Sequence, residues 1–108
     1  MSPGPQRAGL TMLDKIWSQH SILERADGET LLYIDRHLIH EVTSPQAFQG
    51  IKERGVKFRR PDRTFGVVDH SIPTTDRSLP IADAQAASQI STFEANCKEH
   101  GITHFLIF

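Results

Sequence analysis

Apolar residues recur along the chain in two patterns that alternate with each other. Helical spacing, with apolar side chains returning every three or four positions, occurs over residues 12–20, 45–54 and 79–100. Compact apolar runs of the kind that form buried strands occur over residues 31–34, 64–68 and 103–108. The pattern therefore predicts three helices and three strands in the order αβαβαβ.

Residues at the ends of two of these segments support the predicted helices. Thr11 precedes the first helix and Asp14 follows three residues later, which is the spacing of a capping box. Ser44 is predicted to cap the second helix, with Pro45 at its first helical position. Gly55 stands where a glycine commonly ends a helix.

Strands separated by helices of this length need crossover connections, which favour parallel pairing. We therefore predict an α/β fold, a three-layer α/β/α arrangement around a mainly parallel sheet. The apolar run at residues 105–108 would leave a sheet edge unpaired. We expect residues 11–108 to be an incomplete part of a larger α/β domain, and the Pro- and Gly-rich residues 1–10 to be a flexible tail.

Charge and cysteine content exclude several classes of protein. The 108 residues carry 12 Lys and Arg against 13 Asp and Glu, so no net field attracts nucleic acid or an anionic membrane. The single cysteine excludes a disulfide framework, and also a zinc site or iron–sulfur cluster built from several cysteines. Because no targeting signal or long apolar segment is visible, we expect a cytoplasmic protein with no membrane or nucleic-acid partner.

Asp69 and His70 are the sharpest candidates for chemistry. They follow the second predicted strand, and functional groups of α/β sheets gather beyond the carboxyl ends of strands. A carboxylate beside an imidazole raises the pKa of that imidazole and orients the ring, which suits a general acid near neutral pH. Neighbouring residues of an extended strand point to opposite faces, so a direct contact requires the backbone to turn here. Alternatively, both residues only solvate the strand end.

A second polar cluster follows the first predicted strand, and contains Asp35, Arg36, His37, His40 and Glu41. An arginine flanked by histidines suits a carboxylate substrate, because the guanidinium group matches the geometry of a carboxylate. The two histidines and the glutamate do not have the spacing of a known metal motif, so no metal ligand is predicted. An ordinary surface ion pair between Asp35 and Arg36 is the alternative.

Three segments together resemble a known family. The run LLYIDRHLIHEVTSPQAF at residues 31–48 is very similar to the N-terminal signature of the large subunit of 3-isopropylmalate dehydratases, in the aconitase superfamily. The run TFGVVDHSIPT at residues 64–74 resembles the next signature, and residues 96–99 resemble the end of the helix that follows. The resemblance extends over about residues 11–104.

This resemblance implies a hydro-lyase that converts 2-isopropylmalate to 3-isopropylmalate through isopropylmaleate, in leucine biosynthesis. It also implies a [4Fe–4S] cluster in the full-length enzyme. By the motif match, His70 paired with Asp69 would help to protonate the departing hydroxyl group. His40 would contact the substrate, and Asp35 and Arg36 would have a supporting role.

The chain also departs from the family pattern. The cysteines that bind the cluster are absent, and the catalytic base of the family belongs to a swivelling domain, which in bacterial dehydratases is a separate small subunit. We therefore expect an N-terminal fragment, from a truncated or split gene or a partial reading frame, that alone holds no cluster and performs no turnover. The alternatives are a homoaconitase or another aconitase-like hydratase, and a non-catalytic remnant or interaction module.

Overall fold

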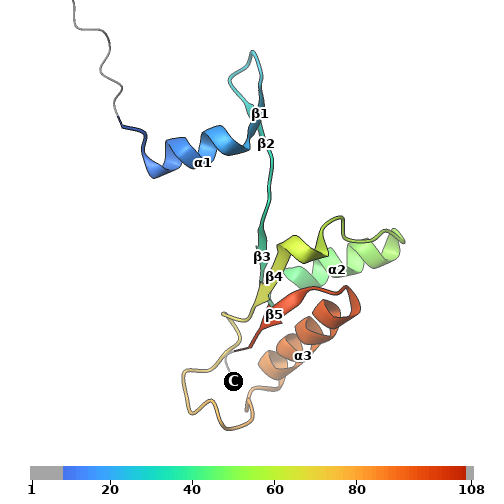
Figure 1. Cartoon of the computed structure of the whole chain (residues 1–108). Helices are drawn as coiled ribbons and strands as arrows, with labels where there is room; N and C mark the ends of the chain where they lie inside the picture. Colours follow the sequence, from blue (N-terminus) through green and yellow to red (C-terminus); the bar gives the residue numbers. More distant parts are fainter. Residues whose placement is uncertain (1–8, 107–108) are drawn as a thin grey trace, which may run out of the picture. The chain divides into compact units, whose positions relative to one another are not determined.

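The computed structural model describes residues 9–106, which belong to two compact units (Figure 1). Unit 1 is Met1–Asp35 and unit 2 is Arg36–Phe108. Among the described residues, no helix has both the length and the apolar character needed to cross a membrane. Residues 107 and 108, which end the third predicted strand, lie outside the described part of the chain.

The described residues of unit 1 form one helix and a two-stranded hairpin. Helix α1 (Met12–His20) begins at the predicted capping box. The Asp14 N–H donates to Thr11 Oγ1 over 3.1 Å, and the Thr11 N–H donates to Asp14 Oδ2 over 2.9 Å. Strands β1 (Ser21–Glu24) and β2 (Thr30–Leu32) pair antiparallel. The predicted first helix is confirmed.

The apolar run at residues 31–34 was predicted to be the first strand of the parallel sheet, and this is wrong. Its first residues form β2, which pairs with β1 across a turn that contains Gly28 at φ 88°. The segment after it, β3 (His37–Ile39), is the strand that enters the parallel sheet. The turn residues close a local hairpin, so Leu31 and Leu32 pair with Leu23 and Ser21 of β1.

Unit 2 is built on a three-stranded parallel sheet in the order β3–β4–β5. Strand β4 (Thr64–Val67) lies in the middle, and β5 (Thr103–Phe105) forms the other edge. Phe65 of β4 stands opposite Leu38 on one side and Thr103 on the other. The α/β class and the parallel sheet are confirmed, whereas β1 and β3 are strands that the predicted order αβαβαβ did not contain.

The crossover from β3 to β4 contains helix α2 (Ser44–Glu53) and a 3₁₀ turn (Pro61–Arg63). The predicted helix cap is wrong by one residue, because Thr43 precedes the helix and Ser44 is its first residue. Ser44 is buried, and its hydroxyl group has no hydrogen-bond partner. The predicted helix end is confirmed, since Gly55 has φ 63°.

The crossover from β4 to β5 contains helix α3 (Ala84–Glu99), which begins about five residues later than the sequence predicted. Asp83 caps it by accepting a 2.7 Å hydrogen bond from the Ala86 N–H. Pro80 and the cap at Asp83 keep the preceding residues out of the helix. Gly101, at φ 68°, follows the helix end as expected.

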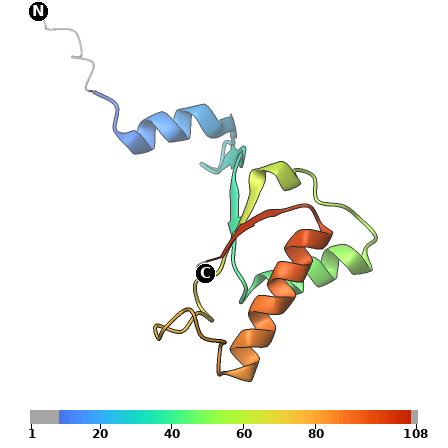
Figure 2. The same ribbon diagram turned by 60° about the horizontal axis from the view of Figure 1, so that its bottom comes forward.

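Helices α2 and α3 lie on the same side of the sheet in unit 2 (Figures 1 and 2). The core of the unit fills this side, and consists of Phe48, Val68, Ile90, Phe93, Cys97 and Ile102. On the other side of the sheet, Leu38 is 73% exposed and Phe105 is 56% exposed. Unit 2 by itself thus has two layers, and the third layer of the predicted arrangement is not formed by its described residues.

Gly66 of β4 packs closely against side chains of α3. A Cβ atom at this position would stand 2.6 Å from Cζ of the fully buried Phe93 and 3.1 Å from Sγ of Cys97. We expect Gly66→Ala to lower the free energy of unfolding by about 1–3 kcal/mol, because the packed core would have to shift. As a control, Gly50→Ala in α2 meets nothing within 4 Å and should raise that free energy by about 0.5–1 kcal/mol. Chemical denaturation checks both variants, and equal effects would contradict the close approach.

Candidate active site

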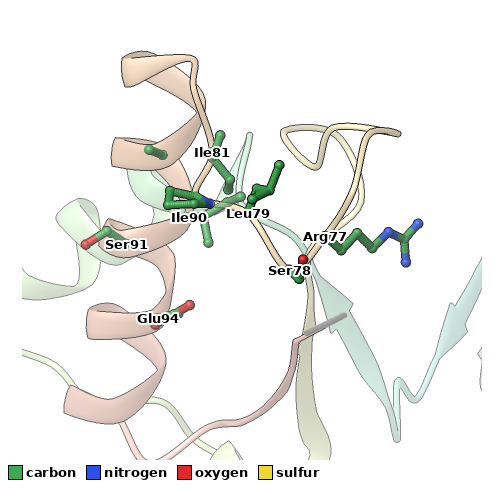
Figure 3. Close-up of a pocket in the computed structure, with 9 residues that line it drawn as sticks. Arg77, Ser78, Leu79, Ile81, Ile90, Ser91 and Glu94 are labelled. Carbon is green, nitrogen blue, oxygen red and sulfur yellow. The ribbon is translucent and has the colours of Figure 1, made fainter.

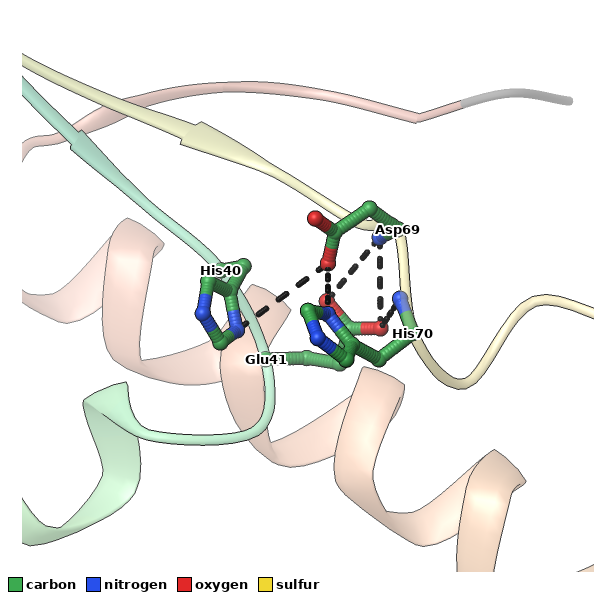
Figure 4. Close-up of side chains that lie close together, drawn as sticks. All are labelled: His40, Glu41, Asp69 and His70. Carbon is green, nitrogen blue, oxygen red and sulfur yellow. Dashed lines mark hydrogen bonds and ion pairs between the residues drawn. The ribbon is translucent and has the colours of Figure 1, made fainter.

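The ends of two neighbouring strands bring four polar residues together (Figure 4). His40 and Glu41 follow β3, whereas Asp69 and His70 follow β4. Because β3 and β4 are parallel neighbours, their carboxyl ends meet at one edge of the sheet. One polar atom from each of the four side chains lies within 4.8 Å of the others. Asp69 and His70, predicted as the acid pair, and His40, predicted as a substrate contact, thus belong to one cluster.

Asp69 and His70 contact each other directly, as the hypothesis of an acid pair requires. His70 Nδ1 donates to Asp69 Oδ1, since an ionised carboxylate only accepts hydrogen bonds. This bond and the nearby negative charge of Asp69 raise the pKa of His70 above its ordinary value of 6.5. The same bond to His70 lowers the pKa of Asp69 below 3.8. The ring therefore holds one proton against Asp69 and has its Nε2 atom available to give or take the other.

His40 lies against the face of His70. The two rings stack with centroids 4.5 Å apart and planes 25° from parallel. The Val42 N–H donates to His40 Nδ1 over 3.2 Å, so that nitrogen is an acceptor and the ring proton is assigned to Nε2. The same Nδ1 atom is 4.0 Å from Asp69 Oδ1. The other ring nitrogen, Nε2, lies 3.5 Å from Thr43 Oγ1 at the start of α2, so its proton has a partner there.

Glu41 is the buried member of the cluster, with no exposed surface. Its carboxylate accepts hydrogen bonds from three consecutive backbone N–H groups: those of Asp69, His70 and Ser71. Burial raises the pKa of this carboxyl group, but the N–H groups, Ser71 foremost, outweigh that effect and hold the pKa below 4.5. Sequence reasoning considered Glu41 only as a weak metal ligand and missed this contact.

The four residues could also be considered as a site for one metal ion, but their geometry does not fit. An ion bound to two imidazoles lies roughly 2 Å from each nitrogen and close to the plane of each ring. The rings of His40 and His70 are stacked, so one ion could not lie in both planes. Both carboxylate oxygens of Glu41 already accept backbone N–H groups. The arrangement fits proton transfer at His70 better than metal binding.

His70 borders a cavity of about 580 Å³ between the loop after β4 and the start of α3. Its lining is mainly apolar, and includes Ile72, Pro73, Leu79, Pro80 and Ile81. A second cavity, of about 570 Å³, lies where residues 77–81 face α3, and Figure 3 shows Ser91 and Glu94 on its helical side. Of the two, only the first is lined by a member of the cluster, and His40 lines a separate cavity of about 190 Å³ beside the start of α2.

A comparison with known families identifies the family of this chain. The sequence profile of the Aconitase family (aconitate hydratase) matches residues 14–107. The chain belongs to the Aconitase family. No solved structure matches the chain. Family membership means that this is an aconitase-type hydro-lyase domain, in which an acid must protonate a hydroxyl group as it leaves carbon.

Aconitase-family enzymes usually carry a [4Fe–4S] cluster, and the residues of this chain do not fit one. Such a cluster is held by several cysteine thiolates. The chain has one cysteine, Cys97, which is fully buried in the core beside Phe93. Burial, with a smaller contribution from Glu94, raises the pKa of the Cys97 thiol to about 11, which opposes formation of the thiolate. Cys97 is therefore a core residue.

Asp35 and Arg36 were predicted to have a supporting role, and neither belongs to the four-residue cluster of His40, Glu41, Asp69 and His70. Asp35 is the last residue of unit 1, where its carboxylate lies 3.9 Å from His20 Nε2. Arg36 is the first residue of unit 2. Their supporting role stays a prediction.

The pairing of Asp69 with His70 makes a direct prediction for titration. In the wild-type chain, His70 should titrate above 6.5, because the neighbouring carboxylate stabilises the imidazolium ion. Asp69→Asn removes that charge and should lower the pKa of His70. NMR titration of the ring protons measures both values, with the exposed His37 as an internal reference. An unchanged His70 pKa in the variant would contradict the pairing.

Proposed function

We propose that this chain is the part of a 3-isopropylmalate dehydratase large subunit that carries the acid of the dehydration step. The observation that carries the proposal is the Asp69–His70 pair beside His40, at the end of an inner strand in a chain of the Aconitase family. The choice of isopropylmalate rests on the similarity of residues 31–48 and 64–74 to the signatures of these dehydratases.

His70 would act as the proton donor to the leaving group. When the C–O bond of the substrate breaks, hydroxide departs with the bonding electron pair and takes the proton from His70 Nε2, which gives water and a neutral imidazole. Asp69 holds the opposite nitrogen, and the raised pKa keeps more of His70 protonated near neutral pH. In the hydration direction the same ring accepts the proton from water. His40, whose ring stacks on that of His70, is the proposed substrate contact.

The cavity beside His70 supports a substrate with an apolar branch. No lysine or arginine is among the residues that line it, and five of these residues are Ile72, Pro73, Leu79, Pro80 and Ile81. A third carboxylate, as in aconitate or homoaconitate, favours a cationic partner, whereas an isopropyl group favours apolar contacts. This lining favours isopropylmalate over the substrate of a homoaconitase.

Other components of the reaction would come from residues that this chain does not contain. We propose a dehydratase small subunit as the partner, because the base of the family belongs to that subunit in bacterial dehydratases. The cysteine content likewise requires that any cluster be held by other residues. For Asp35 and Arg36 we keep the proposal of a supporting role.

An assay of substrate choice tests the proposal. The tagged chain would be purified anaerobically from its host with its associated polypeptides, and then supplied with 2-isopropylmalate, homocitrate or citrate. Ultraviolet absorbance follows the unsaturated intermediate. We expect turnover of 2-isopropylmalate to exceed that of the other two acids by at least about tenfold. Preferred turnover of homocitrate or citrate would contradict the substrate, and the absence of all three activities would favour a non-catalytic role.

A further inference from the structure

A turn of backbone immediately after β4 depends on Glu41, which follows the neighbouring strand. The Ser71 N–H donates to Glu41 Oε1 over 2.6 Å and the His70 N–H donates to the same oxygen over 2.7 Å. The Asp69 N–H contacts both oxygens, at 3.1 and 3.2 Å. A fully buried carboxylate just after β3 thus accepts hydrogen bonds from three successive residues that follow β4, and Figure 4 shows those from Asp69 and His70.

These three N–H groups belong to residues beyond the end of β4, where no neighbouring strand of the described chain accepts their hydrogen bonds. Strand β4 ends at Val67, and the backbone must then turn so that the side chains of Asp69 and His70 can meet. Partly buried N–H groups without acceptors would be costly, and a carboxylate is the strongest acceptor that a side chain provides. The Ser71 hydroxyl also donates to Gln89 Oε1 of α3, which ties the same turn to the helix.

We propose that Glu41 is a positioning residue for the acid pair: its buried carboxylate fixes the backbone of residues 69–71 so that His70 meets Asp69. The inference deepens the proposed function and rests on it, since His70 is the acid of that reaction. Glu41 itself touches neither substrate nor the transferred proton. A positioning role can be distinguished from general stabilisation. Replacing Glu41 should change the pKa of His70 and the amide exchange of residues 69–71, whereas a loss of stability elsewhere would change neither.

NMR of the 108-residue chain tests this directly. In Glu41→Gln, the introduced amide has one acceptor oxygen, and its NH₂ group would face the backbone donors. We expect hydrogen exchange of the Asp69, His70 and Ser71 amides to accelerate about tenfold relative to the amides of β4. The pKa of His70 should fall by about half a unit or more, because the turn loosens and a negative charge is lost.

Thr64→Val is the matched control. Thr64 is also a buried polar residue of unit 2, and its hydroxyl donates to the Arg60 carbonyl oxygen over 3.2 Å, away from the cluster. This variant should lose stability and leave both the His70 pKa and the relative exchange at residues 69–71 unchanged. A lower melting temperature for Glu41→Gln with the same unchanged readouts would overturn the proposal, because Glu41 would then act only on stability.

Glu41→Asp covers the case in which Glu41→Gln does not fold. It keeps the charge but shortens the side chain by one methylene group, so it should loosen the turn and give shifts in the same directions. Wild-type exchange at all three amides in this variant would overturn the proposal. The NMR readouts need no turnover, so they fail only if the positioning role is wrong, whereas the substrate assay fails if the proposed function is wrong.

Discussion

Replacing His70 with alanine is expected to lower the turnover of 2-isopropylmalate by about 10²–10⁴-fold in the assembled enzyme. The imidazole holds a proton-donating nitrogen opposite the one bound by Asp69, and its raised pKa favours the protonated form. Alanine cannot replace that proton source. The measurement is kcat from the absorbance of the unsaturated intermediate. Visible absorption follows the amount of iron–sulfur cluster in the assembled enzyme.

His37→Ala is the control for that variant. His37 is an exposed histidine of β3, three residues before His40, and it is not a member of the cluster. Its replacement should leave kcat within about twofold of wild type. A His70→Ala enzyme with near-normal kcat would remove His70 from the role of acid.

Replacing Phe93 with alanine is expected to produce the largest loss of stability, about 3–5 kcal/mol in the free energy of unfolding of unit 2. Phe93 is fully buried in α3, and its ring packs beneath Gly66 of the central strand. Among the described residues of the unit, six buried hydrophobic side chains form the core, so the cavity left by a missing ring has few neighbours that could fill it. Because small domains are typically stable by about 5–15 kcal/mol, this loss removes much of the total.

Leu38→Ala is the matched control for the core. Leu38 is a large apolar residue of the same sheet, but it is 73% exposed. Its replacement should change the free energy of unfolding by no more than about 0.5 kcal/mol. Urea unfolding followed by circular dichroism measures both variants. A Phe93→Ala variant as stable as Leu38→Ala would show that α3 does not provide the core of the unit.

Local signals in the sequence predicted the helices better than the pairing of the strands. The capping pair of Thr11 and Asp14 and the glycine at position 55 act within a few residues, so they are visible in one sequence. The apolar run at residues 31–34 has the same pattern whether it pairs with a neighbouring strand or enters a sheet. Its partner in the hairpin was not recognised, so the parallel strand was placed about six residues too early.

At the candidate site too, contacts between residues close in sequence could be predicted, whereas contacts between distant residues could not. Asp69 and His70 are adjacent in sequence, so their pairing could be proposed once a turn was assumed. His40 was assigned through the resemblance to a family. The contacts of Glu41 join it to residues 28 to 30 positions away, and nothing in the local sequence indicates them. Only the parallel pairing of β3 with β4 brings these residues together.

The most direct test of the central claim compares the pH dependence of kcat for dehydration in wild type and Asp69→Asn. His70 must be protonated to donate, so kcat should fall as the pH rises through the pKa of His70. Because Asp69 raises that pKa, the high-pH decline should begin at lower pH in the variant, in the same direction as the change in the His70 pKa measured by NMR. A decline at the same pH in both enzymes, despite a shifted His70 pKa, would contradict the assignment of His70 as the acid.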